Sequence, residues 1–111
     1  WTHLVGFIYF VYLGIAMAVS FVTGNNANAD QACSLFWVLL LVAASSYCLM
    51  SSFFYHLCSC MGNDTRECTY RLDLAGIVVL IAVSYFTGIA LGYRCFPELQ
   101  FFYLVYSACI T

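Results

Sequence analysis

The sequence predicts an all-α fold, a polytopic transmembrane helix bundle, from its composition and from the length of its apolar runs. Of its 111 residues, 65% are hydrophobic and 7% are charged, whereas a soluble domain carries roughly 25% charged residues. The mean hydropathy is +0.95. The apolar runs approach the length of about 20 residues that a transmembrane helix needs, and they lack the alternation or the short length of strands. Lipid is therefore the expected solvent. The net charge of -2, without a basic patch, excludes a nucleic-acid-binding protein.

The first two predicted spans are uncharged. Residues 4–22 form the first, which lies between Trp1, an aromatic residue of the type found at membrane interfaces, and a turn signal that begins at Thr23. A polar loop follows. Residues 33–57 form the second span, which is long enough to cross the bilayer with some tilt.

The third predicted span covers residues 74–93, and a fourth begins at about residue 101, after a short loop that contains Pro97. We treat residues 1–111 as a single membrane domain. Because the sequence starts at Trp1 and ends inside an apolar run, we expect it to be a fragment of a longer membrane protein.

Small residues at helical spacing predict where helices pack closely. Ser84, Gly88 and Gly92 form two successive small-xxx-small steps in the third span. Gly14 and Ala18 form a weaker step in the first span. In lipid such steps allow helix backbones to approach one another.

The few charges indicate an orientation. Arg66 and Arg71 lie in the polar connection 58–71, on one side of the predicted membrane, and Arg94 lies on the other. The positive-inside rule then places the connection 58–71 in the cytoplasm. Asn63-Asp64-Thr65 matches a glycosylation acceptor, which would argue for the reverse orientation.

Three polar side chains flank the connection between the second and third spans. Ser52 and His56 are four residues apart and so share one helix face, and Asp73 opens the third span. In an antiparallel hairpin His56 and Asp73 would lie at one depth and could form a cavity with Ser52. Ionisable groups at this position are costly and often functional. Structural roles also stay open: an interfacial His56, a helix-capping Asp73 and a Ser52 bonded to its own helix.

A local metal site is a further hypothesis. His56, Cys58, Cys60 and Cys68 are suitable zinc ligands, although C-x-C is not the usual spacing of a zinc ribbon. The seven cysteines show no disulfide framework. His3 lies at the start of the first span, on the same side as His56, where we expect an interfacial residue and not a ligand.

Three motifs in register resemble the progestin and adipoQ receptor (PAQR) family, which includes the adiponectin receptors and relatives of bacterial haemolysin III. They are WTHLVGF at residues 1–7, Ser52-Phe-Phe-Tyr-His56, and Leu72-Asp73-Leu74-Ala75-Gly76, followed by Tyr93-Arg94-Cys95. The resemblance covers essentially the whole chain and is closer to the adiponectin-receptor branch.

The resemblance implies a seven-helix PAQR-type fold with a cytoplasmic N-terminus, of which this chain holds the N-terminal part. It also implies a zinc ion near the cytoplasmic face, held by His56 and by an H-x-x-x-H pair on the seventh helix, which lies outside this sequence. Asp73 then matches the aspartate that holds or activates a zinc-bound water, Ser52 matches the motif serine, and His3 belongs to a stretch that provides no ligand. Zinc-dependent hydrolysis of ceramide-like lipid amides is the implied activity.

Two alternatives remain open at this stage. One is a receptor for a hormone or steroid with a structural zinc, and the other is a metal-free channel or transporter. The expected partners are membrane lipid, a ceramide-like substrate and an extracellular hormone. The expected location is the plasma membrane or the Golgi and endoplasmic reticulum, with Ser52, His56 and Asp73 near the cytoplasmic face.

Overall fold

The protein is represented by a computed structural model, which describes residues 1–24 and 28–110. Four helices follow in order: α1 (Thr2–Thr23), α2 (Ala29–Cys58), α3 (Asn63–Gly92) and α4 (Pro97–Ile110). The described residues contain no strand. The predicted all-α helix bundle is therefore confirmed.

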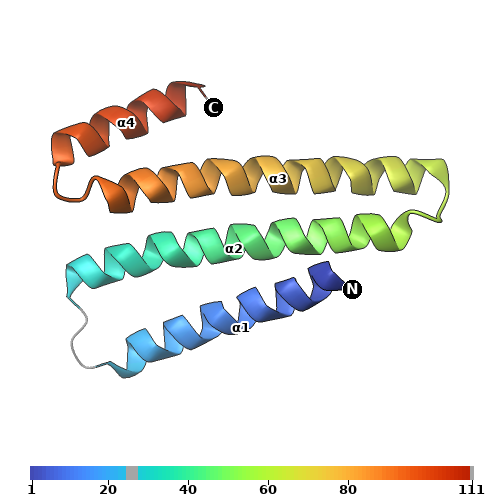
Figure 1. Cartoon of the computed structure of the whole chain (residues 1–111), viewed down its shortest axis with the longest axis horizontal. Helices are drawn as coiled ribbons and strands as arrows, with labels where there is room; N and C mark the ends of the chain where they lie inside the picture. The colour runs from blue at the N-terminus through green and yellow to red at the C-terminus, as the bar shows by residue number, and fades with distance from the viewer. Residues whose placement is uncertain (25–27, 111) are drawn as a thin grey trace.

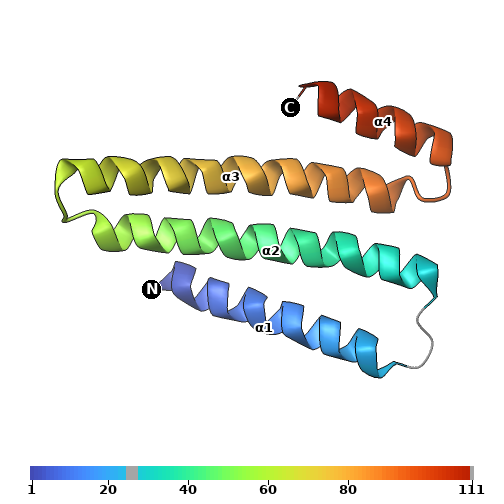
Figure 2. The ribbon, with the colours of Figure 1, turned by 180° about the vertical axis from the view of Figure 1, so that it is seen from behind.

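The helices lie side by side in a single layer, each antiparallel to the one before it (Figures 1 and 2). Within the described residues, α1 packs on α2, α2 on α3 and α3 on α4, and no other pair of helices is in contact. The layer measures 51 × 37 × 16 Å, and its thinnest dimension is little more than the diameter of one helix, about 10–12 Å. Both faces of the layer are consequently open.

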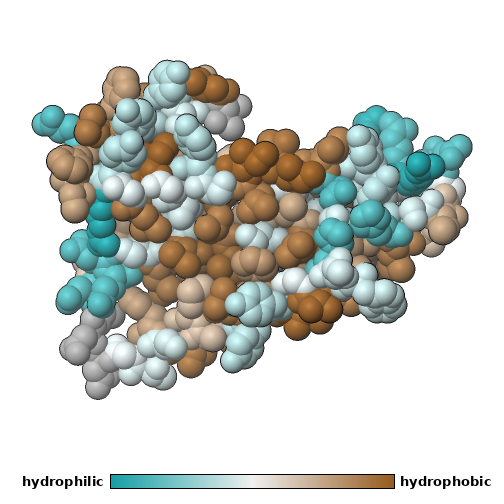
Figure 3. All heavy atoms as spheres, in the orientation of Figure 1, coloured by the Kyte–Doolittle hydropathy of each residue, from teal (hydrophilic) through white to brown (hydrophobic). Residues whose placement is uncertain are grey.

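In the part of the chain that the structure describes, three helices are long and apolar enough to cross a membrane: α1, α2 and α3. The 30 residues of α2 and of α3 correspond to about 45 Å of helix, more than the hydrocarbon core of about 30 Å. The chain is thus a multi-pass membrane protein. Figure 3 shows the same arrangement, with hydrophilic side chains gathered mainly at the two ends of the layer and hydrophobic ones between them.

The small buried core also fits a lipid environment. Among the described residues, four hydrophobic side chains are buried, those of Val42, Ala44, Ile89 and Ala90. Large apolar side chains are exposed on every helix, including Ile8 on α1 at 58% and Ile81 on α3 at 60%. Such a surface would aggregate in water, but it needs no cover in lipid.

The polar connection 58–71 is mostly helical, which the sequence analysis did not predict. α3 begins at Asn63, well before the apolar run that starts at residue 74, and its first turn contains Asp64, where the helix dipole favours an acidic residue. An ion pair of 2.5 Å between Arg71 and Glu67 bridges one turn of this segment. The helix can extend beyond the lipid because its first three turns are polar.

Within residues 1–24 and 28–110, the small-residue pattern of α3 has no packing partner. Among these residues, a Cβ atom added to Gly88 or to Gly92 would meet no other group within 4 Å, and Ser84 is exposed. The weaker pattern of α1 does find a partner, because a Cβ on Gly14 would stand 3.1 Å from Cγ1 of Val42 on α2. The close approach of α3 to α2 occurs at Gly76 instead.

Candidate functional site

Three contacts fix the register of α2 against α3. The hydroxyl of Thr87 donates a hydrogen bond of 3.4 Å to the carbonyl of Trp37. The rings of Tyr55 and Tyr70 lie 5.7 Å apart. Between these levels Gly76 packs against α2. All three contacts agree with one antiparallel register, which allows the level of every other side chain along the pair to be read.

Gly76 brings the two helices together beside the predicted site. A Cβ atom at this position would stand 2.6 Å from Oγ of Ser51 and 3.1 Å from Cα of Cys48. Ser51 and Gly76 are both buried, and the Ser51 hydroxyl donates to the Cys48 carbonyl over 2.9 Å. A glycine is therefore required for this approach, as at many close helix crossings in membranes.

Asp73 and Ser52 lie at the same level of the α2–α3 pair. Asp73 is three residues before Gly76, and Ser52 directly follows Ser51, so the register that Gly76 and Ser51 define brings the two to one depth. Both side chains are half-buried. The structure thus places these two predicted residues beside the close helix approach.

His56 lies one turn nearer to the end of the pair. The sequence analysis put it at the depth of Asp73, but the register matches Asp73 with Ser52, four residues earlier, an offset of about 6 Å. Side chains on a helix tilt toward its N-terminus. Because α2 and α3 are antiparallel, His56 leans toward the membrane interior and Asp73 toward the end of the bundle, so the tilt reduces the offset.

The side chains of Ser52, His56 and Asp73 make no hydrogen bond or ion pair within residues 1–24 and 28–110. Their neighbours do: Ser51 and Ser59 each donate to a carbonyl of α2. Ser52 is therefore not bonded back to its own helix. Asp73 is not a helix cap either, because α3 begins at Asn63. A half-buried carboxylate without a hydrogen-bond or ion-pair partner among the described residues is costly.

His3 is the residue that the sequence analysis underestimated. Its half-buried ring lies 5.4 Å from the ring of His56, with the two planes inclined at 36°. No spacing within α1 could have indicated this contact, because it depends on α1 packing beside the end of α2, as Gly6 does on Leu49.

The hypothesis of a local zinc site finds no support. No group of three or more histidine, cysteine, aspartate or glutamate side chains in the described parts of the chain is placed to hold a metal ion. This includes His56, Cys58, Cys60 and Cys68, all of which are described. Any metal bound by this chain would need ligands from elsewhere.

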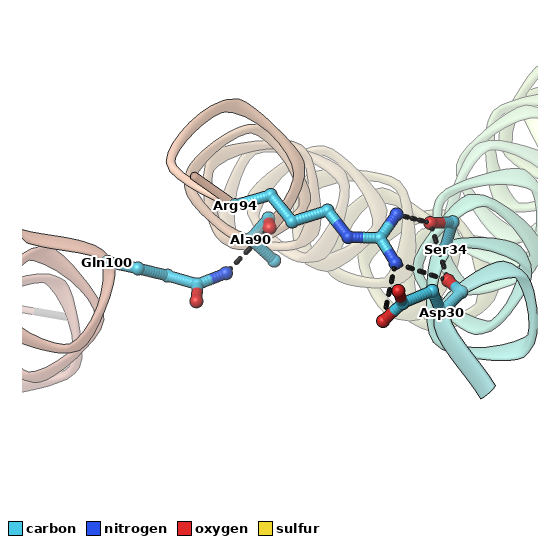
Figure 4. A network of polar contacts seen from close by, with 5 residues as sticks. All are labelled: Asp30, Ser34, Ala90, Arg94 and Gln100. Atoms are coloured by element: carbon cyan, nitrogen blue, oxygen red, sulfur yellow. Dashed lines mark hydrogen bonds and ion pairs between the residues drawn. The ribbon is translucent and has the colours of Figure 1, made fainter. Parts of the chain in front are cut away.

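A second polar cluster lies at the opposite end of the layer and joins α2, α3 and α4 (Figure 4). Arg94 donates to Oγ of Ser34 at 2.5 Å and to the carbonyl of Asp30 at 2.6 Å, and it pairs with the Asp30 carboxylate at 3.2 Å. Gln100 donates to the carbonyl of Ala90 at 2.6 Å. Because these contacts tie the α3–α4 turn to α2 and tie α4 to α3, we interpret this cluster as structural.

The comparison with known protein families decides the identity. Residues 1–111 match the family described as haemolysin-III related. The chain belongs to this family. Membership of this family accounts for the helical fold, the membrane spans and the sequence motifs, and the resemblance to PAQR proteins is confirmed.

Relatives of this haemolysin-III-related chain come from plants and animals. It is 33% identical over 108 residues to heptahelical transmembrane protein 1 of Arabidopsis thaliana. This match covers 94% of the chain and 32% of that protein. It is 32% identical over 98 residues to progestin and adipoQ receptor family member 3 of Homo sapiens. This match covers 86% of the chain and 30% of that protein. The chain thus spans about a third of the length of these relatives. No solved structure matches it.

Proposed function

We propose that this chain contributes to a seven-helix PAQR-type protein that hydrolyses ceramide-like lipid amides with the help of zinc. In this proposal His56 is a zinc ligand, Asp73 accepts the proton of the attacking water, and Ser52 binds the substrate. The observation that carries it is a group of three polar side chains at one end of the α2–α3 pair that make no hydrogen bond or ion pair with other described residues, whereas Ser51 and Ser59 beside them do.

The side chains present fit a zinc ion in their chemistry. Imidazole nitrogen and carboxylate oxygen both bind zinc, and a catalytic zinc has three protein ligands and one open position. His56 offers a ring that no hydrogen bond of the described residues engages. The remaining ligands would come from other helices of the whole protein. Zinc in such a site supplies a Lewis acid and a water that ionises near neutral pH.

Asp73 and Ser52 have separate tasks in this chemistry. The Asp73 carboxylate can orient a water and accept its proton, because it is held half-buried and no cation among the described residues neutralises it. The Ser52 hydroxyl at the same level can donate a hydrogen bond to the amide oxygen of the substrate, where negative charge develops during attack.

The surface of the α2–α3 pair near these residues is apolar and open, as a lipid substrate would require. An open, apolar groove of about 360 Å³ runs along the α2–α3 pair at this level. Its lining consists of Tyr47, Met50, Ser51, Phe54, Thr69 and Leu72. Phe54 and Leu72 are 45% and 47% exposed, so that an acyl chain could enter from the bilayer. Ser51 belongs to this lining, whereas Ser52, His56 and Asp73 do not, so the groove lies near the three residues and does not contain them.

A receptor function is the second candidate, because one relative is named progestin and adipoQ receptor family member 3. A receptor would use zinc at His56 to hold helices together and would not need Asp73 for turnover. The two candidates thus differ in what Asp73 does.

The test compares zinc content and amide hydrolysis in the purified whole protein and its variants. We expect stoichiometric zinc in the wild type, its loss in His56→Ala, and its retention in Asp73→Ala with the release of fatty acid from ceramide abolished. Equal fatty-acid release by wild type and Asp73→Ala, both folded and loaded with zinc, would favour the receptor. A folded wild type without zinc would favour a metal-free channel or transporter.

A further inference from the structure

The position of α1 on α2 is set by two glycines. A Cβ atom on Gly6 would stand 3.2 Å from Cδ1 of Leu49, and one on Gly14 would stand 3.1 Å from Cγ1 of Val42. Because both contacts are tight, α1 has little freedom to slide or rotate on α2. His3 lies one turn before Gly6 and so projects from the same face, toward α2.

At this position the ring of His3 meets the ring of His56, with 5.4 Å between the centroids. The ring of Tyr55 also lies 5.4 Å from that of His56, but Tyr55 is its neighbour on the same helix. Among the described residues, His3 is therefore the ring from another helix that contacts His56.

His56 needs a ring partner from another helix because of its position at the end of α2. It lies in the last turn of α2 and is exposed, so without a contact its side chain could adopt several rotamers, and fixing one of them costs free energy. A histidine that binds a metal almost always donates its other ring N–H to an acceptor, which fixes the ring and its tautomer. A neutral imidazole has one accepting nitrogen.

We propose that His3 is a positioning residue that holds the imidazole of His56 in the orientation in which it binds zinc. At a centroid separation of 5.4 Å, rotation of the rings can bring one nitrogen of each within hydrogen-bonding distance. His56 then donates to His3 and keeps its other nitrogen for the metal. This inference rests on the proposed function and adds the first helix to the zinc site.

The test measures zinc affinity of the purified whole protein by competition with a chelator, and the visible spectrum after replacement of zinc by cobalt(II). His3→Phe keeps an aromatic ring but has no acceptor, and His3→Gln restores an acceptor. The matched control is Tyr9→Phe, on the lipid-facing side of α1 where Tyr9 is 59% exposed. We expect His3→Phe to weaken zinc binding roughly 10–100-fold, the usual effect of losing the partner of a metal-bound histidine.

We further expect His3→Phe to change the cobalt spectrum, His3→Gln to recover part of the affinity, and Tyr9→Phe to behave as wild type. A wild-type affinity and spectrum in His3→Phe, together with loss of zinc in His56→Ala, would overturn the role of His3 alone. Zinc binding that survives His56→Ala would overturn the proposed function and, with it, this inference. If His3→Phe does not fold, His3→Ala and His3→Gln decide, and equal affinities of these two would overturn the proposal.

Discussion

Gly76 of α3 lies so close to Ser51 of α2 that a single added methyl group would stand 2.6 Å from the serine Oγ. This contact sits one turn from Asp73 and next to Ser52, the two residues to which the proposed function assigns the water and the substrate. The distance between the helices at this level therefore also sets the distance between those two side chains.

The first prediction concerns this contact. Gly76→Ala should lower the free energy of unfolding by about 1–3 kcal/mol, the usual cost of overpacking a close interface. It should also reduce hydrolysis, because α2 and α3 move apart. Chemical unfolding of the purified protein measures the first effect.

Gly88→Ala is the matched control for Gly76→Ala, because it lies in the same helix and its added methyl group meets no other described residue within 4 Å. It should be neutral or stabilise the protein by up to about 1 kcal/mol, since alanine favours a helix over glycine. Equal effects of the two substitutions would show that the Gly76 contact does not hold the helices.

The second prediction concerns the proton acceptor. Asp73→Asn keeps the size and polarity of the side chain but not its charge, and so it should lower kcat by about 100-fold or more, the usual contribution of a general base. Zinc content should not change. Asp64→Asn, an exposed position in the first turn of the same helix, should leave kcat as in wild type. A similar loss in both variants would point to a general effect of charge.

The third prediction concerns the far end of the layer. Arg94→Met removes the contacts to Asp30 and Ser34 and should destabilise the protein by about 1–2 kcal/mol, mainly through the lost hydrogen bonds. Asp30→Asn should cost less than about 1 kcal/mol, because the exposed ion pair is weak and the bond to the Asp30 carbonyl survives. Thermal unfolding measures the stability of both variants. A larger loss of stability in Asp30→Asn than in Arg94→Met would show that the ion pair contributes more than the hydrogen bonds, which would contradict this prediction.

The fourth prediction concerns orientation. Cys60 and Cys95 are both exposed and lie in turns at opposite ends of the layer (Figure 1). If the His56 end faces the cytoplasm, a membrane-impermeant thiol reagent added to intact cells should label a single-cysteine variant at Cys95 and not one at Cys60. Permeabilised cells, in which both should react, provide the control, and the reverse pattern in intact cells would place the His56 end outside.

The sequence was sufficient to predict the helical, membrane-spanning character of the chain, because lipid forces long apolar segments to satisfy their own backbone hydrogen bonds. The short connection predicted an antiparallel hairpin with His56 and Asp73 at one depth, whereas the register matches Asp73 with Ser52. The sequence did not predict that residues 63–71 are helical, and so the depth of His56 was wrong by one turn.

Packing partners were harder to predict than spans. Small residues show where a helix can be approached and not which helix approaches it, so the GxxxG step of Gly88 and Gly92 was preferred over Gly76, which makes the contact. The pairing of His3 with His56 depends on α1 lying beside the end of α2, and no residue spacing within one helix contains that information.

The most direct test of the central claim is ceramide hydrolysis by the purified whole protein before chelation, after removal of zinc, and after zinc is returned. The account predicts that fatty-acid release stops on removal and resumes on addition in the wild type, whereas His56→Ala shows no release in any of the three states. Release at an unchanged rate by folded, zinc-free wild-type protein would contradict it.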